Sequence, residues 1–374
     1  MNSQFLKRAA SLVLSGVMIT SLLVGCGGGN QTQPSAPPAE QSPAAPDNGG
    51  GDKPADEKKL EGELLFWHFN KDEATALAKA FETKYPGVKV KVEITDQNGN
   101  AYQDKITNGV RSGKGMPDVY AAEAAYVKRF VNMQNGYEDI SAAPYSAEGL
   151  LSEVIPYTID IGRSPDGKMR ALSHQGTPGG IGYKRDVAKE VLGTDDPAVL
   201  SEWFSSKDKI LELAAKCKEK GKVLFPGNEE LRKIYLGGRT DPWIKDGKFI
   251  MDPKMLEYIE LSKALRDMKQ DSGMKAWEAP WKSACEDTIH LAYAVPTWGI
   301  RWIVGENDKA NMEKGRWGVA SGPFPYFWGG TWFGVYSKSE KKDLAWAFVK
   351  YITTDKDFQK EWAKNTGDFM SNVA

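Results

Sequence analysis

The stretch that decides the fold covers residues 62–94 and reads GELLFWHFNKDEATALAKAFETKYPGVKVKVEI. Its first six residues, GELLFW, are mostly apolar and predict a buried strand. Asn70 and Glu73 have the spacing of a helix-capping box, and the helical pattern behind them keeps its apolar residues on one face until Pro86. Residues 88–94 alternate between apolar and polar, which is typical of a half-buried strand. The stretch therefore predicts a β-α-β unit.

The same order of elements continues beyond this unit. A second helical pattern ends at Gly113, residues 117–121 form a third apolar strand, and a third helix is marked by Val127, Phe130 and Val131. Strands that alternate with helices in this way predict a parallel sheet covered on both faces. Ligands of such sheets bind at the carboxyl ends of the strands, which here carry residues 67–70, 96–98 and 122–126.

The middle and end of the chain have a different pattern. Residues 176–182, GTPGGIG, are interpreted as a glycine-rich crossing between domains. Long helical patterns follow near residues 197–220 and 253–270, and two more lie near 341–352 and 355–364. The part from about residue 60 onward is too long for one hydrophobic core, so two domains are expected.

The N-terminus has the features of an export signal. Lys7 and Arg8 precede the uncharged residues 9–25, and Cys26 follows directly. This ending resembles the lipobox of bacterial lipoproteins, which implies a signal peptide over 1–25 and a diacyl lipid on Cys26. A transmembrane anchor is the alternative, although the uncharged run is short for a span of about 20 residues. Residues 26–59 have almost no apolar content and predict a disordered tether.

Composition narrows the possible functions. Removal of residues 1–25 leaves 47 basic and 50 acidic side chains, a net charge of −3, and no basic patch indicates nucleic-acid binding. The three histidines lack metal-ligand spacing, so we expect no metal and no cofactor. Cys217 falls on the apolar face of a helical pattern, which favours a buried thiol; a Cys217–Cys285 disulfide stays open.

Tryptophan is concentrated in one segment. Seven of the twelve tryptophans lie between residues 277 and 332, several of them beside glycine or proline. Any single one can be a core residue, but so many indoles are hard to bury with every N–H paired. Flat aromatic faces combined with carboxylates and amides suit a sugar, and the same walls suit a cation. The residue types do not separate these two ligands.

The motifs together resemble the extracellular solute-binding proteins of ATP-binding cassette (ABC) importers, in the sugar-binding family that includes the maltose-binding protein. The resemblance runs from about residue 64 to 373 and rests on motifs at residues 81–90, 113–119, 179–186, 345–350 and 365–368. It implies a periplasmic-binding-protein-like α/β fold with two lobes, a hinge and an interlobe ligand cleft. Lobe one would comprise 60–171 plus 328–374, and lobe two 172–327.

Carried over position by position, the resemblance implies eight ligand-binding residues. Glu123 takes the place of an aspartate that accepts hydrogen bonds from sugar hydroxyls. Trp298 matches a tryptophan that stacks on the sugar. The full set is Trp67, Asn70, Glu123, Tyr126, Gln175, Trp298, Arg301 and Trp332. Structural roles compete with these functions: core packing for Trp67, a solvated loop acid for Glu123 and an ion pair for Arg301. The resemblance also implies further helices of lobe two beyond residue 374, without which an apolar face of that lobe is expected to be exposed.

The expected function is therefore that of a monomeric, lipid-anchored protein on the extracytoplasmic face of the cell membrane. It would capture a mono- or oligosaccharide and deliver it to the transmembrane permease subunits of an ABC transporter, without being an enzyme. The alternatives are a binding protein for a polyamine or another cationic solute, and a ligand-sensing lipoprotein. A glycoside hydrolase would need two carboxylates about 5–10 Å apart, for which Glu278 and Glu286 are the candidates.

Overall fold

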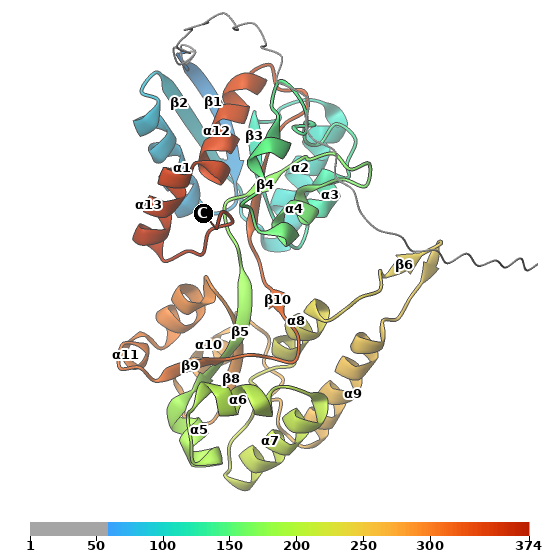
Figure 1. Ribbon diagram of the computed structural model, residues 1–374, viewed down its shortest axis with the longest axis vertical. Helices are drawn as coiled ribbons and strands as arrows, with labels where there is room; N and C mark the ends of the chain where they lie inside the picture. Colours follow the sequence, from blue (N-terminus) through green and yellow to red (C-terminus); the bar gives the residue numbers. More distant parts are fainter. Residues whose placement is uncertain (1–58, 374) are drawn as a thin grey trace, which may run out of the picture. The chain divides into compact units, whose positions relative to one another are not determined.

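The computed structural model describes residues 59–373, and two β-sheets organise this part of the chain into two lobes (Figure 1). The predicted signal peptide, Cys26 and the tether up to residue 58 lie outside the described residues. None of the helices in the described part is long and apolar enough to cross a membrane.

The first sheet has five strands in the order β2-β1-β3-β11-β4. Strand β1 (Gly62–His68) runs parallel to both β2 (Val88–Ile94) and β3 (Val119–Glu123). The predicted parallel arrangement of the first three strands is therefore confirmed. Strand β11 (Thr331–Val335) is antiparallel to β3 and to β4 (Leu172–Ser173). Pairing across such a long sequence separation leaves no local signal, so the fourth and fifth strands were not predicted.

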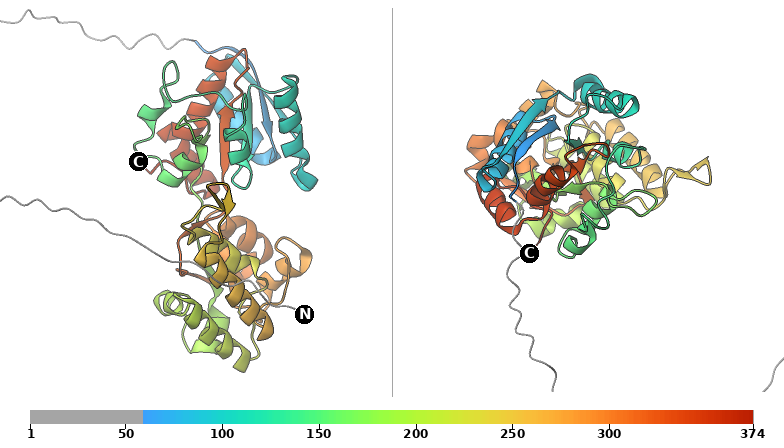
Figure 2. Two further views of the ribbon diagram at one scale, coloured as in Figure 1. Left: turned by 90° about the vertical axis from the view of Figure 1, so that its right-hand side faces the viewer. Right: turned by 90° about the horizontal axis from the view of Figure 1, so that it is seen from above.

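Helices of the first lobe come from both ends of the described chain. They are α1 (Lys71–Lys84), α2 (Ala101–Ser112), α3 (Val127–Val131), α4 (Pro156–Gly162), α12 (Lys342–Thr354) and α13 (Lys356–Thr366), with 3₁₀ turns η1 (Asn98–Asn100) and η2 (Ala147–Leu150). The C-terminal helices, red in Figures 1 and 2, belong with the blue N-terminal elements. The ring of Phe81 on α1 meets the ring of Phe348 on α12 edge-on, with centroids 5.1 Å apart.

The second sheet is antiparallel and centres on β5 (Pro178–Lys184), which pairs with β8 (Ala292–Pro296), β9 (Trp317–Ala320) and β10 (Tyr326–Phe327). Most of the predicted glycine-rich crossing is thus a central strand. Crowding is the physical reason: a Cβ on Gly179 would lie 2.2 Å from the Tyr326 ring, and one on Gly182 would lie 2.7 Å from Val295. Glycine is needed here for close packing.

Helices of the second lobe cover this sheet. They are α5 (Arg185–Leu192), α6 (Pro197–Trp203), α7 (Lys207–Glu219), α8 (Glu229–Gly237), α9 (Pro253–Asp267), α10 (Ala279–Glu286) and α11 (Lys309–Met312), with a π-helical turn η3 (Ile300–Gly305) and a small hairpin of β6 (Ile244–Lys245) and β7 (Lys248–Phe249). The single helix predicted near 197–220 is wrong. It is split after Trp203, and Ser206 caps the second piece by accepting a hydrogen bond from the Lys209 N–H.

Two segments join the lobes and lie side by side. The Trp328 N–H donates to the Thr177 carbonyl at 3.1 Å, and the Thr177 hydroxyl donates to the Gly329 carbonyl at 3.0 Å. Strand β4 pairs with β11 in the first sheet, so Leu172 and Ser173 belong to the first lobe.

Both cysteines of the described part are free and buried. Cys217 and Cys285 form no disulfide, so the interpretation of Cys217 as a buried thiol is confirmed. Burial raises the pKa of each thiol to about 12.

Candidate functional site

Glu123, Tyr126 and Trp67 lie at the carboxyl ends of β1 and β3, which pair with Trp67 opposite Tyr120. Glu123 is half-buried, and its Oε2 accepts a hydrogen bond from the Ala125 N–H at 2.8 Å. Burial raises the pKa of this carboxyl, although backbone hydrogen bonds from Ala125 and Ala124 oppose the shift. The end of the sheet therefore presents a partly desolvated carboxylate.

Two polar groups at this end of the sheet have unused hydrogen-bonding capacity. The buried Tyr126 hydroxyl and Trp67 Nε1 have no hydrogen-bond partner in the described part of the chain. Buried polar atoms are normally paired, so an orphaned pair marks a place for water or a ligand. Trp67 is only 4% exposed, and Lys105 Nζ lies 3.7 Å from the centroid of its ring. Its indole N–H, not its ring face, is the group left free.

Three other predicted residues have structural roles. The Asn70 side chain caps α1, accepting a hydrogen bond from the Glu73 N–H at 3.1 Å. Gln175 Nε2 donates to Asp368 at 3.4 Å, which holds the first crossing against the C-terminal segment. Trp332 is fully buried and its Nε1 donates to the Thr158 carbonyl at 2.9 Å. Trp332 therefore presents no free face in this structure.

Trp298 lies in a cluster of indoles in the second lobe. It is half-buried, and its Nε1 donates to the Trp328 carbonyl at 2.6 Å. Its ring is stacked on Trp277, with centroids 5.9 Å apart and planes 16° apart, and meets Trp328 edge-on at 5.0 Å. Lys233 Nζ lies 3.9 Å from the centroid of the Trp328 ring. We call Trp277, Trp298 and Trp328 the indole cluster.

Arg301 lies in the turn η3, which begins two residues after Trp298. Its side chain is exposed, and its guanidinium lies 4.7 Å from the centroid of the Trp302 ring. The turn thus presents a cation and an exposed indole shortly after Trp298 in the chain.

The return segment at residues 328–330 contacts both groups of predicted residues. The Ala124 N–H, beside Glu123, donates to the Gly330 carbonyl at 3.0 Å. A Cβ on Gly329 would lie 3.0 Å from Trp298 Nε1. Both glycines have positive φ values, 77° and 105°, which residues with a Cβ rarely adopt. Gly329 therefore lets Trp298 approach this backbone closely, and the Gly330 carbonyl holds the loop that follows Glu123.

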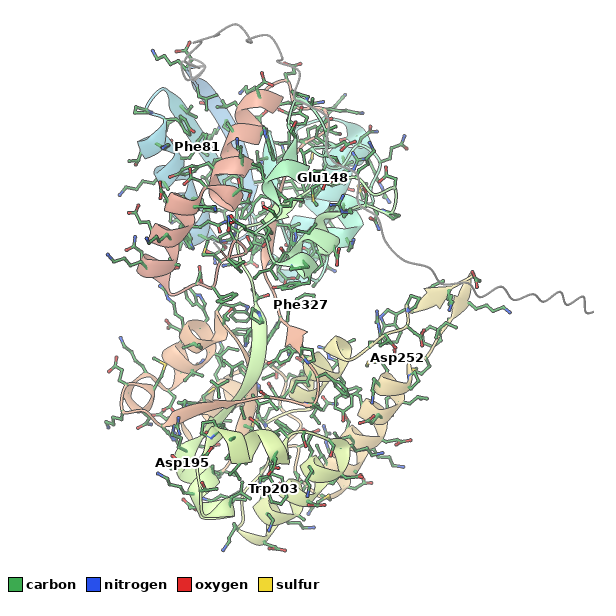
Figure 3. The ribbon with its side chains drawn as sticks, viewed as in Figure 1. Phe81, Glu148, Asp195, Trp203, Asp252 and Phe327 are labelled. Carbon is green, nitrogen blue, oxygen red and sulfur yellow. The ribbon has the colours of Figure 1, made fainter. Side chains whose placement is uncertain are left out.

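Sequence reasoning missed several residues of this region. Trp277 and Trp328 were counted in the tryptophan-rich segment but were not assigned to the site, and Lys233 had no motif at all. Phe327, labelled in Figure 3, is 40% exposed and stacks on Tyr157 with centroids 4.7 Å apart. The sequence contained one usable signal, the density of tryptophan, but it could not say which indoles remain accessible.

A buried charged cluster lies where the first crossing begins. Glu73 approaches His68 Nε2 at 3.7 Å and His174 Nε2 at 3.2 Å. The pKa of His68 is lowered to about 4, mainly by burial; the Glu73 charge opposes this shift and His174 contributes to it. No cluster of His, Cys, Asp or Glu within residues 59–373 has an arrangement that could hold a metal ion.

One constellation resembles hydrolase chemistry. Ser272 Oγ lies 2.8 Å from His290 Nε2, and His290 Nδ1 lies 2.7 Å from Asp287 Oδ2. The backbone N–H groups around the serine are already engaged, however: that of Ser272 by the Phe225 carbonyl and that of Gly273 by the Asp271 carboxylate. An acyl-transfer site needs free donors for the oxyanion. The trio instead ties two loops of the second lobe together.

A surface hollow beside α5 has a volume of about 510 Å³ but does not include the predicted site residues. The charged residues that line it form ion pairs with one another: Arg316 with Asp186 at 3.0 Å, and Arg185 with Asp195 at 3.4 Å. Because these charges satisfy one another, the hollow is a weaker ligand-site candidate than the indole cluster.

Comparison with known proteins shows which family the chain matches. The family described as "Bacterial extracellular solute-binding protein" matches residues 76–372. Among solved structures, an extracellular solute-binding protein of family 1 matches with a TM-score of 0.72 and 19% identity, over 83% of this chain and 79% of that chain. The GacH receptor of Streptomyces glaucescens GLA.O matches with a TM-score of 0.65 and 21% identity, over 84% of this chain and 81% of that chain.

A third solved structure is the galacto-N-biose/lacto-N-biose I-binding protein of the ABC transporter from Bifidobacterium longum. It matches with a TM-score of 0.67 and 15% identity, over 84% of this chain and 79% of that chain. At these identities the structural matches establish the two-lobe fold, and the family match covers most of the chain. The chain belongs to the bacterial extracellular solute-binding proteins, which implies an extracytoplasmic location.

Proposed function

We propose that this solute-binding protein captures a carbohydrate and delivers it to the permease subunits of an ABC transporter. The observation that carries the proposal is the indole cluster, in which partly exposed aromatic rings lie beside the segment that also contacts the Glu123 loop. Sugar C–H faces stack on indoles, and sugar hydroxyls need both acceptors and donors. Glu123, the Tyr126 hydroxyl and Trp67 Nε1 supply those polar groups.

The positions of two lysines favour a sugar over a cation. A cationic ligand binds an aromatic face through cation–π attraction. Lys233 already lies over Trp328 at 3.9 Å, and Lys105 lies over Trp67 at 3.7 Å. A second cation beside either ring would be repelled by the resident ammonium group. A neutral ligand meets no such repulsion, so a polyamine is the weaker candidate.

The ligands of similar proteins point in the same direction. The GacH receptor structures include a complex with acarbose, and the Bifidobacterium longum protein was solved with lacto-N-biose. A further match is a maltose-bound MalE3 of T. maritima, with a TM-score of 0.61 and 17% identity over 83% of this chain and 82% of that chain. These ligands belong to those proteins, and together they support a saccharide as the class of solute to test here.

The N-terminal part of the proposal rests on the sequence. Cys26 would carry a diacyl lipid after cleavage of residues 1–25, and residues 26–59 would tether a monomeric binding protein to the outer face of the membrane. A single acyl chain anchors weakly, whereas two chains anchor stably. Fractionation tests this directly: the wild type should sediment with membranes and Cys26→Ala should be released. Equal amounts in the membrane fraction would contradict lipid anchoring.

A thermal-shift screen tests the proposed function. The purified chain would be melted with monosaccharides, with malto-, xylo-, cello- and galacto-oligosaccharides, and with polyamines. A ligand at 100 times its dissociation constant stabilises the folded state by about 2.7 kcal/mol, which raises Tm by several degrees. We expect a rise with one saccharide series. A rise with polyamines alone would contradict the proposal and favour a cationic solute.

A further inference from the structure

Trp277 has a backbone conformation that a bulky residue rarely adopts. Its φ is +74°, in the left-handed region where a Cβ collides with the neighbouring backbone and where glycine is favoured. It follows Ala276 in the loop before α10, and the strain occurs at one of the chain's largest side chains. Strained residues of this kind concentrate at ligand-binding and switch sites.

Contacts inside the protein cover only part of the Trp277 side chain. The Trp277 ring lies among three other indoles, with centroid distances of 5.6 Å to Trp281, 5.9 Å to Trp298 and 6.0 Å to Trp328. These contacts fix its orientation. Nevertheless Trp277 is 44% exposed, whereas Trp281 is fully buried. A residue present only to fill the core would not leave so much apolar surface in water.

We propose that Trp277 is a carbohydrate-stacking residue that determines affinity, and that the fold holds it under backbone strain for that purpose. The inference rests on the proposed function and adds a residue to its site. Trp277 is stacked on Trp298 with planes 16° apart, and it is the more exposed of the two rings. Its three indole neighbours hold the ring rigid before the sugar arrives, so little ordering entropy is lost on stacking.

The backbone strain provides a test that separates binding from structure. Trp277→Gly and Trp277→Ala both remove the indole, but only glycine relieves the left-handed conformation. In the full-length chain, both variants should lose affinity for the saccharide identified by screening, by about tenfold or more, as expected when an aromatic stacking face is lost. Trp277→Gly should have a higher Tm than Trp277→Ala. Trp277→Phe should retain most of the affinity.

Trp243→Ala is the matched control, because Trp243 is 37% exposed and stacks on Phe249 near the small hairpin of β6 and β7. It should bind the saccharide as the wild type does. Unchanged affinity in folded Trp277→Gly and Trp277→Ala would overturn the inference and leave the proposed function intact. Tighter binding would also overturn it, because Trp277 would then occupy the place of the sugar. A wild type that binds no carbohydrate would overturn the proposed function and this inference with it.

Discussion

At Glu123, burial and hydrogen bonding act on the carboxyl in opposite directions. Burial raises its pKa, and backbone N–H groups of Ala125 and Ala124 lower it, with a net rise. A raised pKa means that the folded state holds the proton more tightly than the unfolded state. The ionised carboxylate therefore costs stability above the unfolded pKa, and this cost disappears as the pH falls through the folded pKa.

Glu123→Gln should separate stability from binding. Because the amide carries no charge to desolvate, Tm at pH 7 should equal or exceed that of the wild type. Saccharide affinity should fall about fivefold or more, as expected when a charged hydrogen-bond acceptor is lost. Calorimetric titration and thermal melts measure the two effects, with exposed Glu63→Gln as the control. A variant with a lower Tm and unchanged affinity would assign Glu123 a purely structural role.

His68 should make stability depend on pH. Its folded pKa of about 4 lies below its usual 6.5, so the unfolded chain takes up a proton that the folded chain rejects. Stability should therefore fall as the pH is lowered from about 6.5 toward 4. The pKa of Glu73 is also lowered, and loss of its charge acts in the same direction.

In the wild type the Asn70 N–H donates to His68 Nδ1 at 2.8 Å. His68→Gln removes the titration of the imidazole and keeps an acceptor for this N–H. The drop in Tm between pH 7 and pH 5 should be smaller in the variant than in the wild type. An identical drop would show that other groups dominate the acid response.

The sequence named candidate site residues but not how accessible each one is. Glu123, Tyr126 and Trp298 were identified from their positions in motifs, and they lie where a ligand could reach them or where hydrogen-bonding capacity is unused. The sequence could not show that Trp332 is buried, because its accessibility depends on residues far along the chain. Nor could it single out Trp277, whose distinguishing feature is a backbone angle. That the eight residues bind a ligand stays a prediction.

At the scale of elements, periodicity identified the strands and helices of the first lobe well. The β-α-β-α-β order and the cap at Asn70 are confirmed because both depend on local sequence. The glycine-rich residues 176–182 carry the chain from the first sheet to the second as predicted, but most of them also belong to strand β5, where glycine relieves crowding. Likewise the pattern near 197–220 continued through a break at Ser206 that only the capping hydrogen bond reveals.

The double glycine of the return segment should be sensitive to a single methyl group. At Gly330, with φ of +105°, a Cβ would lie 3.1 Å from the Trp332 ring, so strain and crowding add. Gly330→Ala should destabilise the fold by about 1–3 kcal/mol. Gly315, with φ of +79° and open space around it, is the matched control for strain alone, and Gly149→Ala should be nearly neutral.

Thermal melts of the three variants would rank these effects. We expect Gly330→Ala to lose the most Tm, Gly315→Ala less, and Gly149→Ala almost none. A Gly330→Ala chain that melts with the wild type would mean that the return segment tolerates a Cβ and does not constrain the site.

At the scale of the whole molecule, the family and the two-lobe fold could be predicted from the order and spacing of motifs. The second lobe exposes apolar side chains near β6, β7 and α9, among them Ile244, Phe249 and Ile259. The identity of the solute could not be predicted, because it depends on the exact placement of loops that local patterns do not encode.

If a saccharide binds against the indole cluster, a single titration should show it. The saccharide that raises Tm would be titrated calorimetrically into the wild type and into Trp298→Ala, at low and at high salt. We expect an affinity that changes little with salt, because the ligand is neutral. Trp298→Ala should lower the affinity at least about tenfold, or by 1.4 kcal/mol. Equal affinity in folded Trp298→Ala, or strong weakening by salt, would contradict saccharide binding against the indole cluster.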